Sequence, residues 1–482
     1  MSNELTKADA ARKRAKNPDS LLSALQNGGP VVWLSCLIMG MGNFATGQIV
    51  KGLLFLLIEV GAFCLLFIPI LPDYSKVAYS GIDWIKMLPS LGDRYDQKIM
   101  DDLGIEKTVY GDRSYLILLY GVIFAFIAVA LVVVWRASVR SGYKAICIKK
   151  SGKKVPTIKD DIRAMFDENI HKTLMMLPFI ALVMFTIMPL VYMICMAFTN
   201  YSDTTEIING VEVNHQNLFN WVGFDTFKQI FSKDSQVGNQ FWDVLGWTLI
   251  WAFFATFLNF FMGTFVAMII NRPTTKLKGF WRTVLSLTIA IPQFVSLLII
   301  NKMFQDNGIV NKLLLQCGFL AQGDKIQFMS NVTNARVFVI IINLWVGIPY
   351  TVMQVTGILK NIPADLYEAA RIDGANAIQQ FMNITLPYMI FVLTPYLITS
   401  FTGNINNFNV IFLLTGGGPF DLKAGTAGKT DLLVTWLYRL SVEKFEYNLA
   451  AVIGIFTFIV LAIVSLVTYR SSGSYKDEEG FK

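Results

Sequence analysis

Three residues that could contact a ligand repeat at helical spacing inside an apolar run. Asn343, Gly347 and Tyr350 fall at i, i+4 and i+7, so they share one helix face, with Val346 beside them. Polar groups inside a membrane span are costly and often line cavities. The Asn343 amide and the Tyr350 hydroxyl can hydrogen-bond a sugar, the Tyr350 ring can stack against the sugar ring, and Gly347 leaves space beside them. The same residues can instead pack helices together, because Asn and Gly are common there. Spacing alone leaves both alternatives open.

Enzyme chemistry finds little support in the sequence. GxSxG, HExxH and GxGxxG motifs are absent, and the Gly-Lys-Thr run at 428–430 lacks the earlier glycine of a phosphate loop, since Lys423 stands there. His171 and His215 are the two histidines, which makes a structural zinc site unexpected. The five cysteines are scattered: Cys36, Cys64, Cys147, Cys195 and Cys317. We therefore expect a non-enzymatic chain without metal or cofactor, in which any ATP is hydrolysed by a partner subunit.

The composition indicates a polytopic membrane protein. Of the 482 residues, 54% are hydrophobic and only 16% charged, against about 25% charged in soluble domains. A membrane span needs about 20 apolar residues. The run at 31–49 carries Gly, Asn, Thr and Gln residues and looks amphipathic or re-entrant. The clear runs predict eight transmembrane helices, in an all-α fold, at 52–72, 114–136, 173–197, 246–270, 284–303, 336–358, 386–403 and 449–469.

The distribution of basic residues predicts the orientation of these spans. The net charge of +7 is modest and is concentrated in a few loops, which fits positive-inside topology better than nucleic-acid binding. Five Lys or Arg lie in 1–29, nine in 137–172 and four in 271–283. We expect these segments and 361–385 to be cytoplasmic, together with both termini. Loops 73–113, 198–245 and 405–448 are then outside, and 73–113 should hold small structural elements.

The polar segment 361–387 separates two spans on the predicted cytoplasmic side. Pro363 suits the start of a helix, and Gly374 can end it by adopting a positive φ. Residues 375–382 can then form a second helix before Pro387. Two short helices joined at a glycine would form a compact knob, although an ordinary connector is the alternative for a helical loop.

This segment resembles the EAA loop of permease subunits in bacterial ABC importers. The motif comprises Glu368-Ala369-Ala370, Gly374 and Ile384-Thr385-Leu386-Pro387. Further segments resemble the MalF-like maltose/maltodextrin permease subunits of the binding-protein-dependent transport system inner membrane component family: Asn404-Ile405-Asn406-Asn407-Phe408, Leu413-Leu414-Thr415-Gly416-Gly417-Gly418-Pro419, Thr430-Asp431-Leu432-Leu433-Val434 and Tyr438-Arg439.

The resemblance implies an ABC importer type I permease core of six helices, with two helices added before it. The expected domains are a charged N-terminal segment at 1–29, a transmembrane pair at 30–172, the core at 173–470 with its EAA loop at 361–387, and a tail at 471–482. The implied partners are a MalG-like second permease, an ATPase dimer, an extracellular sugar-binding protein and membrane lipid. The residues implied to couple to the ATPase are Glu368, Ala369, Ala370, Asp373 and Gly374.

The resemblance also implies the sugar-binding positions. These are Asn343, Val346, Gly347, Tyr350, Asn404 and Asn407, with Gln293 where relatives carry a small hydroxyl residue. Ile289 and Gly403 replace expected aromatic residues, which suggests a wider pocket or a different ligand length. Asn406 and Asn409 are expected to cap a helix end. The short loop 198–245 resembles the form found in Gram-positive bacteria.

These observations predict a permease for maltose or maltodextrin in a bacterial cell membrane. Another oligosaccharide is the near alternative. An ATP-independent secondary transporter or channel is the rival from a different class, and it would need charged groups in mid-span or an inverted repeat. Glu59 is the main acid within a clear span, and it lies outside the expected core.

Overall fold

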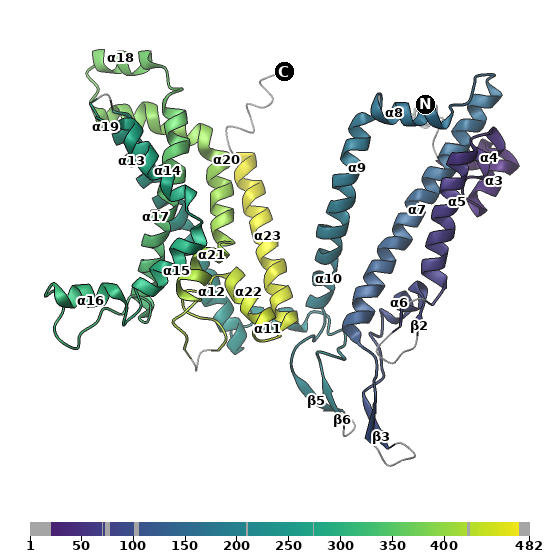
Figure 1. The fold of residues 1–482 in the computed structure, drawn as a ribbon, viewed down its shortest axis with the longest axis horizontal. Helices are drawn as coiled ribbons and strands as arrows, with labels where there is room; N and C mark the ends of the chain where they lie inside the picture. Colours follow the sequence, from purple (N-terminus) through teal and green to yellow (C-terminus); the bar gives the residue numbers. More distant parts are fainter. Residues whose placement is uncertain are drawn as a thin grey trace, which may run out of the picture. The chain divides into compact units, whose positions relative to one another are not determined.

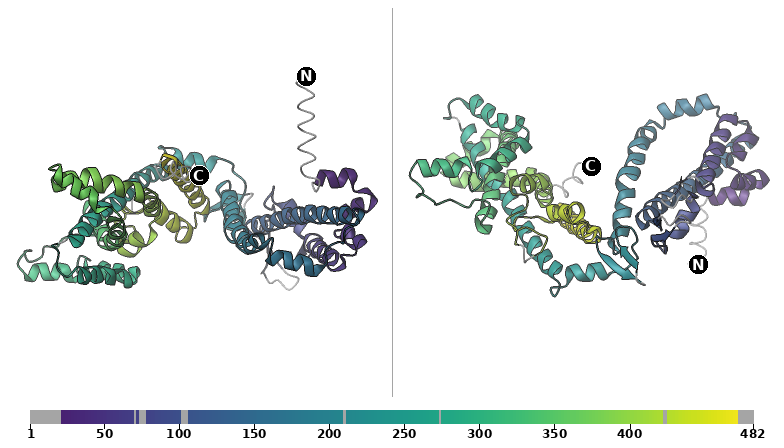
Figure 2. Two further views of the ribbon diagram at one scale, coloured as in Figure 1. Left: turned by 90° about the horizontal axis from the view of Figure 1, so that it is seen from above. Right: turned by 60° about the horizontal axis from the view of Figure 1, so that its bottom comes forward.

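The computed structural model describes residues 21–69, 71–72, 78–100, 106–208, 211–272, 274–421 and 425–471. The chain divides into two compact units, Met1–Trp221 and Val222–Lys482, coloured purple to teal and teal to yellow (Figures 1 and 2). Of the predicted charged head and tail, 1–20 and 472–482 lie outside the described residues.

The first unit contains helices with three small hairpins. Its helices are α2 (Leu21–Asn27), α3 (Gly29–Leu37), α4 (Met41–Thr46), α5 (Ile49–Phe67), α6 (Gly81–Met87), α7 (Ser114–Lys150), α8 (Ile158–Phe166), α9 (Ile170–Leu182), the π-helical η1 (Val183–Ile187) and α10 (Met188–Ala197). The antiparallel strand pairs are β1 (Leu71–Pro72) with β2 (Ala78–Tyr79), β3 (Gln97–Met100) with β4 (Glu106–Val109), and β5 (Thr205–Ile208) with β6 (Val211–Asn214). The hairpins of 73–113 confirm the expected small elements there.

The ambiguous run at 31–49 forms two short helices, α3 and α4, neither long enough to cross a bilayer. Gly40 breaks the chain between them with φ +86. Side chains satisfy the freed backbone groups: Glu59 accepts a hydrogen bond from the Met39 N–H at 2.7 Å, and Ser138 accepts one from the Gly40 N–H at 2.9 Å. Glu59 therefore has a structural partner, and its presence in a span gives no support to ion coupling.

Gly42 of α4 is the point at which this broken segment meets α7. A Cβ added at Gly42 would lie 2.8 Å from the backbone Cα of Gly142, which cannot move aside as a side chain can. We expect Gly42→Ala to destabilise the first unit by about 1–3 kcal/mol through overpacking. Thermal unfolding of the purified protein measures this. Gly61→Ala is the matched control, because nothing lies within 4 Å of its added Cβ, and equal midpoints for the two variants would contradict the prediction.

The predicted basic loop 137–172 is wrong over its first part. Helix α7 continues without a break to Lys150, which gives it 37 residues and a length of about 56 Å, well beyond a hydrocarbon core of about 30 Å. Lys and Arg are good helix formers, so the basic sequence extends the helix instead of ending it. The true turn is at 151–157, followed by α8, which Lys51 anchors through Asp161 at 3.1 Å.

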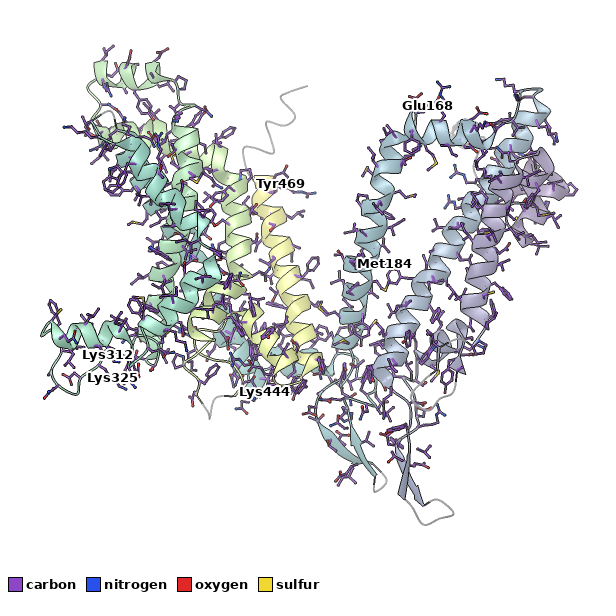
Figure 3. The ribbon with its side chains drawn as sticks, viewed as in Figure 1. Glu168, Met184, Lys312, Lys325, Lys444 and Tyr469 are labelled. Atoms are coloured by element: carbon purple, nitrogen blue, oxygen red, sulfur yellow. The ribbon has the colours of Figure 1, made fainter. Side chains whose placement is uncertain are left out.

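The second unit contains the remaining helices. They are α11 (Asp225–Phe231), α12 (Gln236–Phe253), η2 (Phe254–Leu258), α13 (Asn259–Asn271), α14 (Lys278–Ala290), α15 (Gln293–Met303), α16 (Ile309–Gln316), α17 (Val332–Leu359), α18 (Ala364–Ile372), α19 (Ala377–Gln380), η3 (Phe381–Thr385), α20 (Leu386–Ile405), α21 (Phe408–Thr415), α22 (Leu433–Val442) and α23 (Tyr447–Ser471). Within this unit, α18 and α19 lie at one end, and α11, α16 and α22 lie at the other (Figure 1). Lys444 lies three residues before α23 and Tyr469 lies in its last turn (Figure 3). Lys312 lies on α16, and Lys325 lies in the segment that follows it.

Seven helical segments of the described chain are long and apolar enough to cross a membrane. The predicted span 284–303 is instead two helices, α14 and α15, bent by 87°. Pro292 explains the break, because it lacks an N–H and forces Ile291 into an extended conformation, with ψ 126. With 13 and 11 residues, the two pieces measure about 20 and 17 Å, and neither alone reaches across the core. Eight spans result only when the bent pair counts as one.

The core of the second unit lies between α12, α17, α20 and α21. Trp251, Val339, Val410 and Ile411 are fully buried there, and Trp247 and Phe338 pack beside them. Helix α21 belongs to this core, so the predicted outside loop 405–448 is wrong at its start, where the chain turns back into the bundle as a helix. Many large apolar side chains remain exposed along the spans, as expected for surfaces that face lipid.

Candidate functional site

A helical bulge in the middle of the span formed by α12, η2 and α13 connects the predicted sugar-binding residues. The five residues of η2 are π-helical, and such bulges are frequent at functional sites. Two polar side chains lie in or directly after the bulge: Thr256, which is 2% exposed, and Asn259, which is 8% exposed. Sequence reasoning missed both, although polar residues inside the apolar run 246–270 were a visible signal.

Asn404 joins the end of α20 to this bulge. Its side-chain amide donates to Thr256 Oγ1 at 3.0 Å, and its backbone carbonyl accepts from Trp251 Nε1 at 3.0 Å. Asn407 donates through Nδ2 to Asn404 Oδ1 at 3.3 Å. The structure therefore brings these two predicted residues together and fixes their orientation through the buried groups behind them.

Asn407 also begins helix α21. Its Oδ1 accepts from the Val410 N–H at 3.3 Å, which is the usual N-cap contact. The expectation that Asn406 and Asn409 cap a helix end is wrong as regards their side chains. Both residues are exposed. Asn406 directly follows α20 and caps it only through its backbone N–H.

The predicted gap at Gly347 is filled by a neighbouring side chain. A Cβ at this position would lie 2.6 Å from Asn259 Nδ2, so any larger residue here would force the Asn259 side chain to shift. Asn259 Nδ2 donates to the Ala255 carbonyl at 2.7 Å, whereas its Oδ1 is buried and has no hydrogen-bond partner in the described structure. Gly347 thus has a packing role, and it presents a buried acceptor, Asn259 Oδ1, at the centre of the candidate site.

The remaining predicted residues differ in their accessibility. Asn343 is buried in α17, Val346 packs against the core, and Tyr350 is 47% exposed. Gln293 is half-buried at the first turn of α15, directly after the break at Pro292. Helix α15 is held to α21 by Asn301, whose Nδ2 donates to the Leu414 carbonyl at 2.6 Å. Tyr350 is therefore the most accessible of the predicted residues on α17.

The segment 361–387 forms the predicted knob at its first helix and turn. Pro363 precedes α18, and Gly374 follows it with φ +77, which confirms the positive φ expected there. The Ala375 N–H donates back to the Ala370 carbonyl at 2.8 Å, a C-terminal glycine motif. Asn376 then caps α19 in a reciprocal capping box with Gln379. The predicted second helix within 375–382 is present as α19, but it does not end before Pro387. It continues through η3 into α20, and Pro387 lies in the first turn of α20.

The surface of this knob is open. Glu368, Ala369, Asp373 and Gly374 are exposed, and Ala370 is half-buried. Ile372, at the tip of α18, is 87% exposed. Leu366 and Ile378 of the same segment are also exposed, at 47% and 74%, so the knob carries several exposed apolar side chains, as expected of a surface that a partner protein covers.

The Gly-Lys-Thr run at 428–430 has a structural role. Thr430 is buried and donates to the Gly418 carbonyl at 2.6 Å. The buried Asp431 accepts from the Gly428 N–H at 2.8 Å and lies 3.4 Å from Arg439 Nε. Burial raises the pKa of Asp431, and Arg439 opposes that shift. These contacts fold the loop 416–432 onto itself, and the run lacks the arrangement of a phosphate loop.

Comparisons with known proteins identify the family. The sequence model for the binding-protein-dependent transport system inner membrane component family matches residues 259–472. The chain is 31% identical over 452 residues to the galactooligosaccharides transport system permease protein GanP of Bacillus subtilis, with 93% of this chain and 99% of that protein covered. The chain belongs to this permease family. The permease is also 31% identical over 454 residues to the maltodextrin transport system permease protein MalC of Streptococcus pneumoniae, covering 92% and 96% of the two chains.

Two further similarities are partial. The permease is 37% identical over 255 residues to the maltose/maltodextrin transport system permease protein MalF of Escherichia coli, which covers 52% of this chain and 49% of that protein. A solved structure of a bacterial alginate ABC transporter in complex with an alginate pentasaccharide-bound periplasmic protein matches with a TM-score of 0.50 and 22% identity, over 66% of this chain and 98% of that one. The second similarity supports the fold alone.

The family membership settles the broad class. The permease is a multi-pass, non-enzymatic membrane subunit of an ABC importer, as the EAA motif predicted, and a secondary transporter is disfavoured. The predicted core boundary at residue 173 stays a prediction. The compact units divide after Trp221, and the family match begins at residue 259.

Proposed function

We propose that the permease imports maltodextrin and forms one half of the translocation path. The neutral polar cluster around η2, in which Asn404 and Asn407 offer amides, carries this proposal. Tyr350 on α17 adds a half-exposed ring with a hydroxyl. A sugar has many hydroxyl groups and no charge, so groups that both donate and accept suit it better than Lys or Glu. Relatives named for maltodextrin transport support the same substrate class.

A second candidate substrate is a galactooligosaccharide. The relative GanP aligns over nearly its whole length, and Ile289 and Gly403 stand where aromatic residues were expected. Uptake of radiolabelled maltotriose and of a labelled galactotriose, in a strain that lacks this permease and in the same strain complemented with it, separates the two. Restored uptake of maltotriose supports the proposal, restored uptake of galactotriose alone replaces the substrate, and restoration of neither refutes both.

The proposed partners are a MalG-like second permease, an ATPase dimer and an extracellular sugar-binding protein. The ATPase would receive the α18 knob, where Ile372 and the exposed Glu368 provide an apolar tip with a charge beside it. Purification of the tagged permease in mild detergent tests this assembly. Stoichiometric recovery of one second permease and two ATPase copies is expected, whereas a permease recovered alone under conditions that preserve uptake activity would contradict it.

The proposed orientation places both termini and the α18 knob in the cytoplasm of a Gram-positive bacterium. Two native cysteines serve as reporters, because Cys147 near the end of α7 and Cys317 after α16 are both free and exposed. With the other three cysteines replaced, we expect a membrane-impermeant maleimide added to intact cells to label Cys317. Cys147 should react only after permeabilisation. Labelling of Cys147 in intact cells would invert the orientation and remove the ATPase contact.

Gly347 offers a test that separates packing from sugar contact. Gly347→Ala should lower the thermal midpoint, because the new Cβ meets Asn259, at a cost of about 1–3 kcal/mol. Adding Asn259→Ala removes the opposing side chain and should restore the midpoint. We expect uptake to stay low in the double variant, because the new methyl group at position 347 still alters the α17 stripe that is proposed to meet sugar. Uptake that returns together with stability would assign Gly347 to packing alone.

A further inference from the structure

We propose that the cavity between α13 and the α18 knob binds one anionic phospholipid of the cytoplasmic leaflet. The proposal rests on the orientation proposed above. It concerns the wall of α18, the coupling helix, that carries Tyr367 and Arg371; the exposed Glu368 and Ile372, which would meet the ATPase, do not line this cavity.

The cavity has a volume of about 640 Å³ and is lined by α13, the end of α17, α18, α19 and η3. That volume is about twenty times the roughly 30 Å³ that one water molecule occupies in the liquid, so it can hold a phosphate and several methylene groups. Tyr367 of α18 closes one wall, and its hydroxyl shares a hydrogen bond with Thr385 Oγ1 at 2.8 Å. The coupling helix is thus tied directly to the wall of the cavity.

The lining changes from apolar to basic along α13. Phe261 and Phe265 are exposed at the membrane-facing end, and Arg272 lies at the end of the helix. The 11 residue-to-residue steps from Phe261 to Arg272 rise about 16 Å, which matches half of a hydrocarbon core of about 30 Å. A phospholipid has these proportions: its acyl chain would lie along the phenylalanines, with its phosphate level with the arginine.

The polar end has the charge required for a phosphate. Arg272 and Arg371 line the cavity, and its described lining contains no carboxylate. Neither arginine is in an ion pair within the described part of the chain, and guanidinium groups bind phosphate through paired hydrogen bonds. Arg272 belongs to the span and Arg371 to the coupling helix. One phosphate that contacts both arginines would therefore link the coupling helix α18 to the end of the membrane-embedded helix α13.

A buried hydroxyl provides an independent observation. Thr264 is 1% exposed and lines the same cavity, and its Oγ1 has no hydrogen-bond partner in the described structure. It lies eight residues, or about 12 Å, from Arg272 along α13, so it is an unsatisfied polar position inside the cavity that a lipid oxygen could fill. Asn271, beside Arg272 in the lining, is already engaged by Arg282 and Thr356.

Lipid competition measured by native mass spectrometry tests the site. The purified full-length permease, alone and in the importer with which it co-purifies, is incubated with equimolar phosphatidylglycerol and phosphatidylcholine. We expect one phosphatidylglycerol to be retained with at least fivefold preference, and R272Q/R371Q to lose that preference. The matched control is K276Q/K360Q, which removes two exposed charges at the same end of the unit but none from the cavity, and it should retain the lipid.

A conservative variant controls for loss of lipid binding that is caused by misfolding. R272K/R371K keeps the charge and should recover part of the preference, with each thermal midpoint recorded beside it. Equal loss in the control, equal retention of the two lipids, or a lipid-free cavity in the assembled importer would each overturn the proposal. Sugar uptake is measured separately: normal uptake with no lipid preference refutes the lipid site alone, whereas bound lipid without uptake of any oligosaccharide refutes the proposed function alone.

Discussion

Gly374→Val abolishes sugar uptake while the permease still inserts and assembles in the membrane. Gly374 has φ +77 directly after the coupling helix, a conformation that β-branched residues rarely adopt. Valine would shift the chain out of this turn and break the hydrogen bond from the Ala375 N–H to the Ala370 carbonyl. The knob would then lose its fixed shape, and a floppy connector transmits motion poorly. Uptake per assembled complex is the measurement, with a drop to background expected.

The chain contains a matched control for the same backbone change. Gly152 has φ +73 after α7, nothing lies within 4 Å of its added Cβ, and the Lys153 N–H donates to the Ile148 carbonyl in the same pattern as at Gly374. Gly152→Val should therefore carry a similar local strain but leave uptake near normal. Full uptake in Gly374→Val, or an equal loss of uptake in both variants, would show that the shape of the knob is not specifically needed for coupling.

A structural feature of this protein could be predicted from the sequence when its cause lies in the neighbouring residues. Gly374 was predictable because a helix that ends in glycine with a small residue after it is a local pattern. Pro292 was visible as a breaker too, yet the apolar length of 284–303 concealed two helices bent by 87°. The continuation of α7 beyond 136 was missed for the opposite reason, because its charges suggested a loop although the residues favour helix.

The centre of the candidate site depends on contacts between distant segments. Whether Thr256 meets Asn404 follows from the π-helical η2, which inserts one residue into the turn and rotates everything after it. Asn259 fills the space beside Gly347 for the same reason. Neither contact has a signature in any short stretch of sequence. The stripe on α17 could therefore be predicted as a helix face, whereas the groups behind it could not.

Tyr350→Ala lowers uptake about tenfold or more without destabilising the permease. Tyr350 is 47% exposed on α17, so its removal leaves little of the core uncovered. Loss of a good polar contact, with the partner group left unpaired, costs about 1–3 kcal/mol, and 1.4 kcal/mol corresponds to a factor of ten. Tyr350→Phe keeps the ring and should lose less uptake, so the two variants distinguish the contribution of ring stacking from that of the hydroxyl hydrogen bond. Initial uptake rates and basal ATPase activity of the purified importer are the measurements.

The control for Tyr350 lies on the opposite face of the same helix. Ile341 is nine residues away, which at 100° per residue is a rotation of 180°, and it is 55% exposed. Ile341→Ala should leave uptake unchanged if the Tyr350 face is the one that meets sugar. A loss of expression or assembly with Tyr350→Ala would assign the residue to helix packing. Normal uptake in Tyr350→Ala would remove it from the sugar site, leaving Asn404 and Asn407, whose amides are anchored by Thr256 and the α21 cap, as the remaining candidates there.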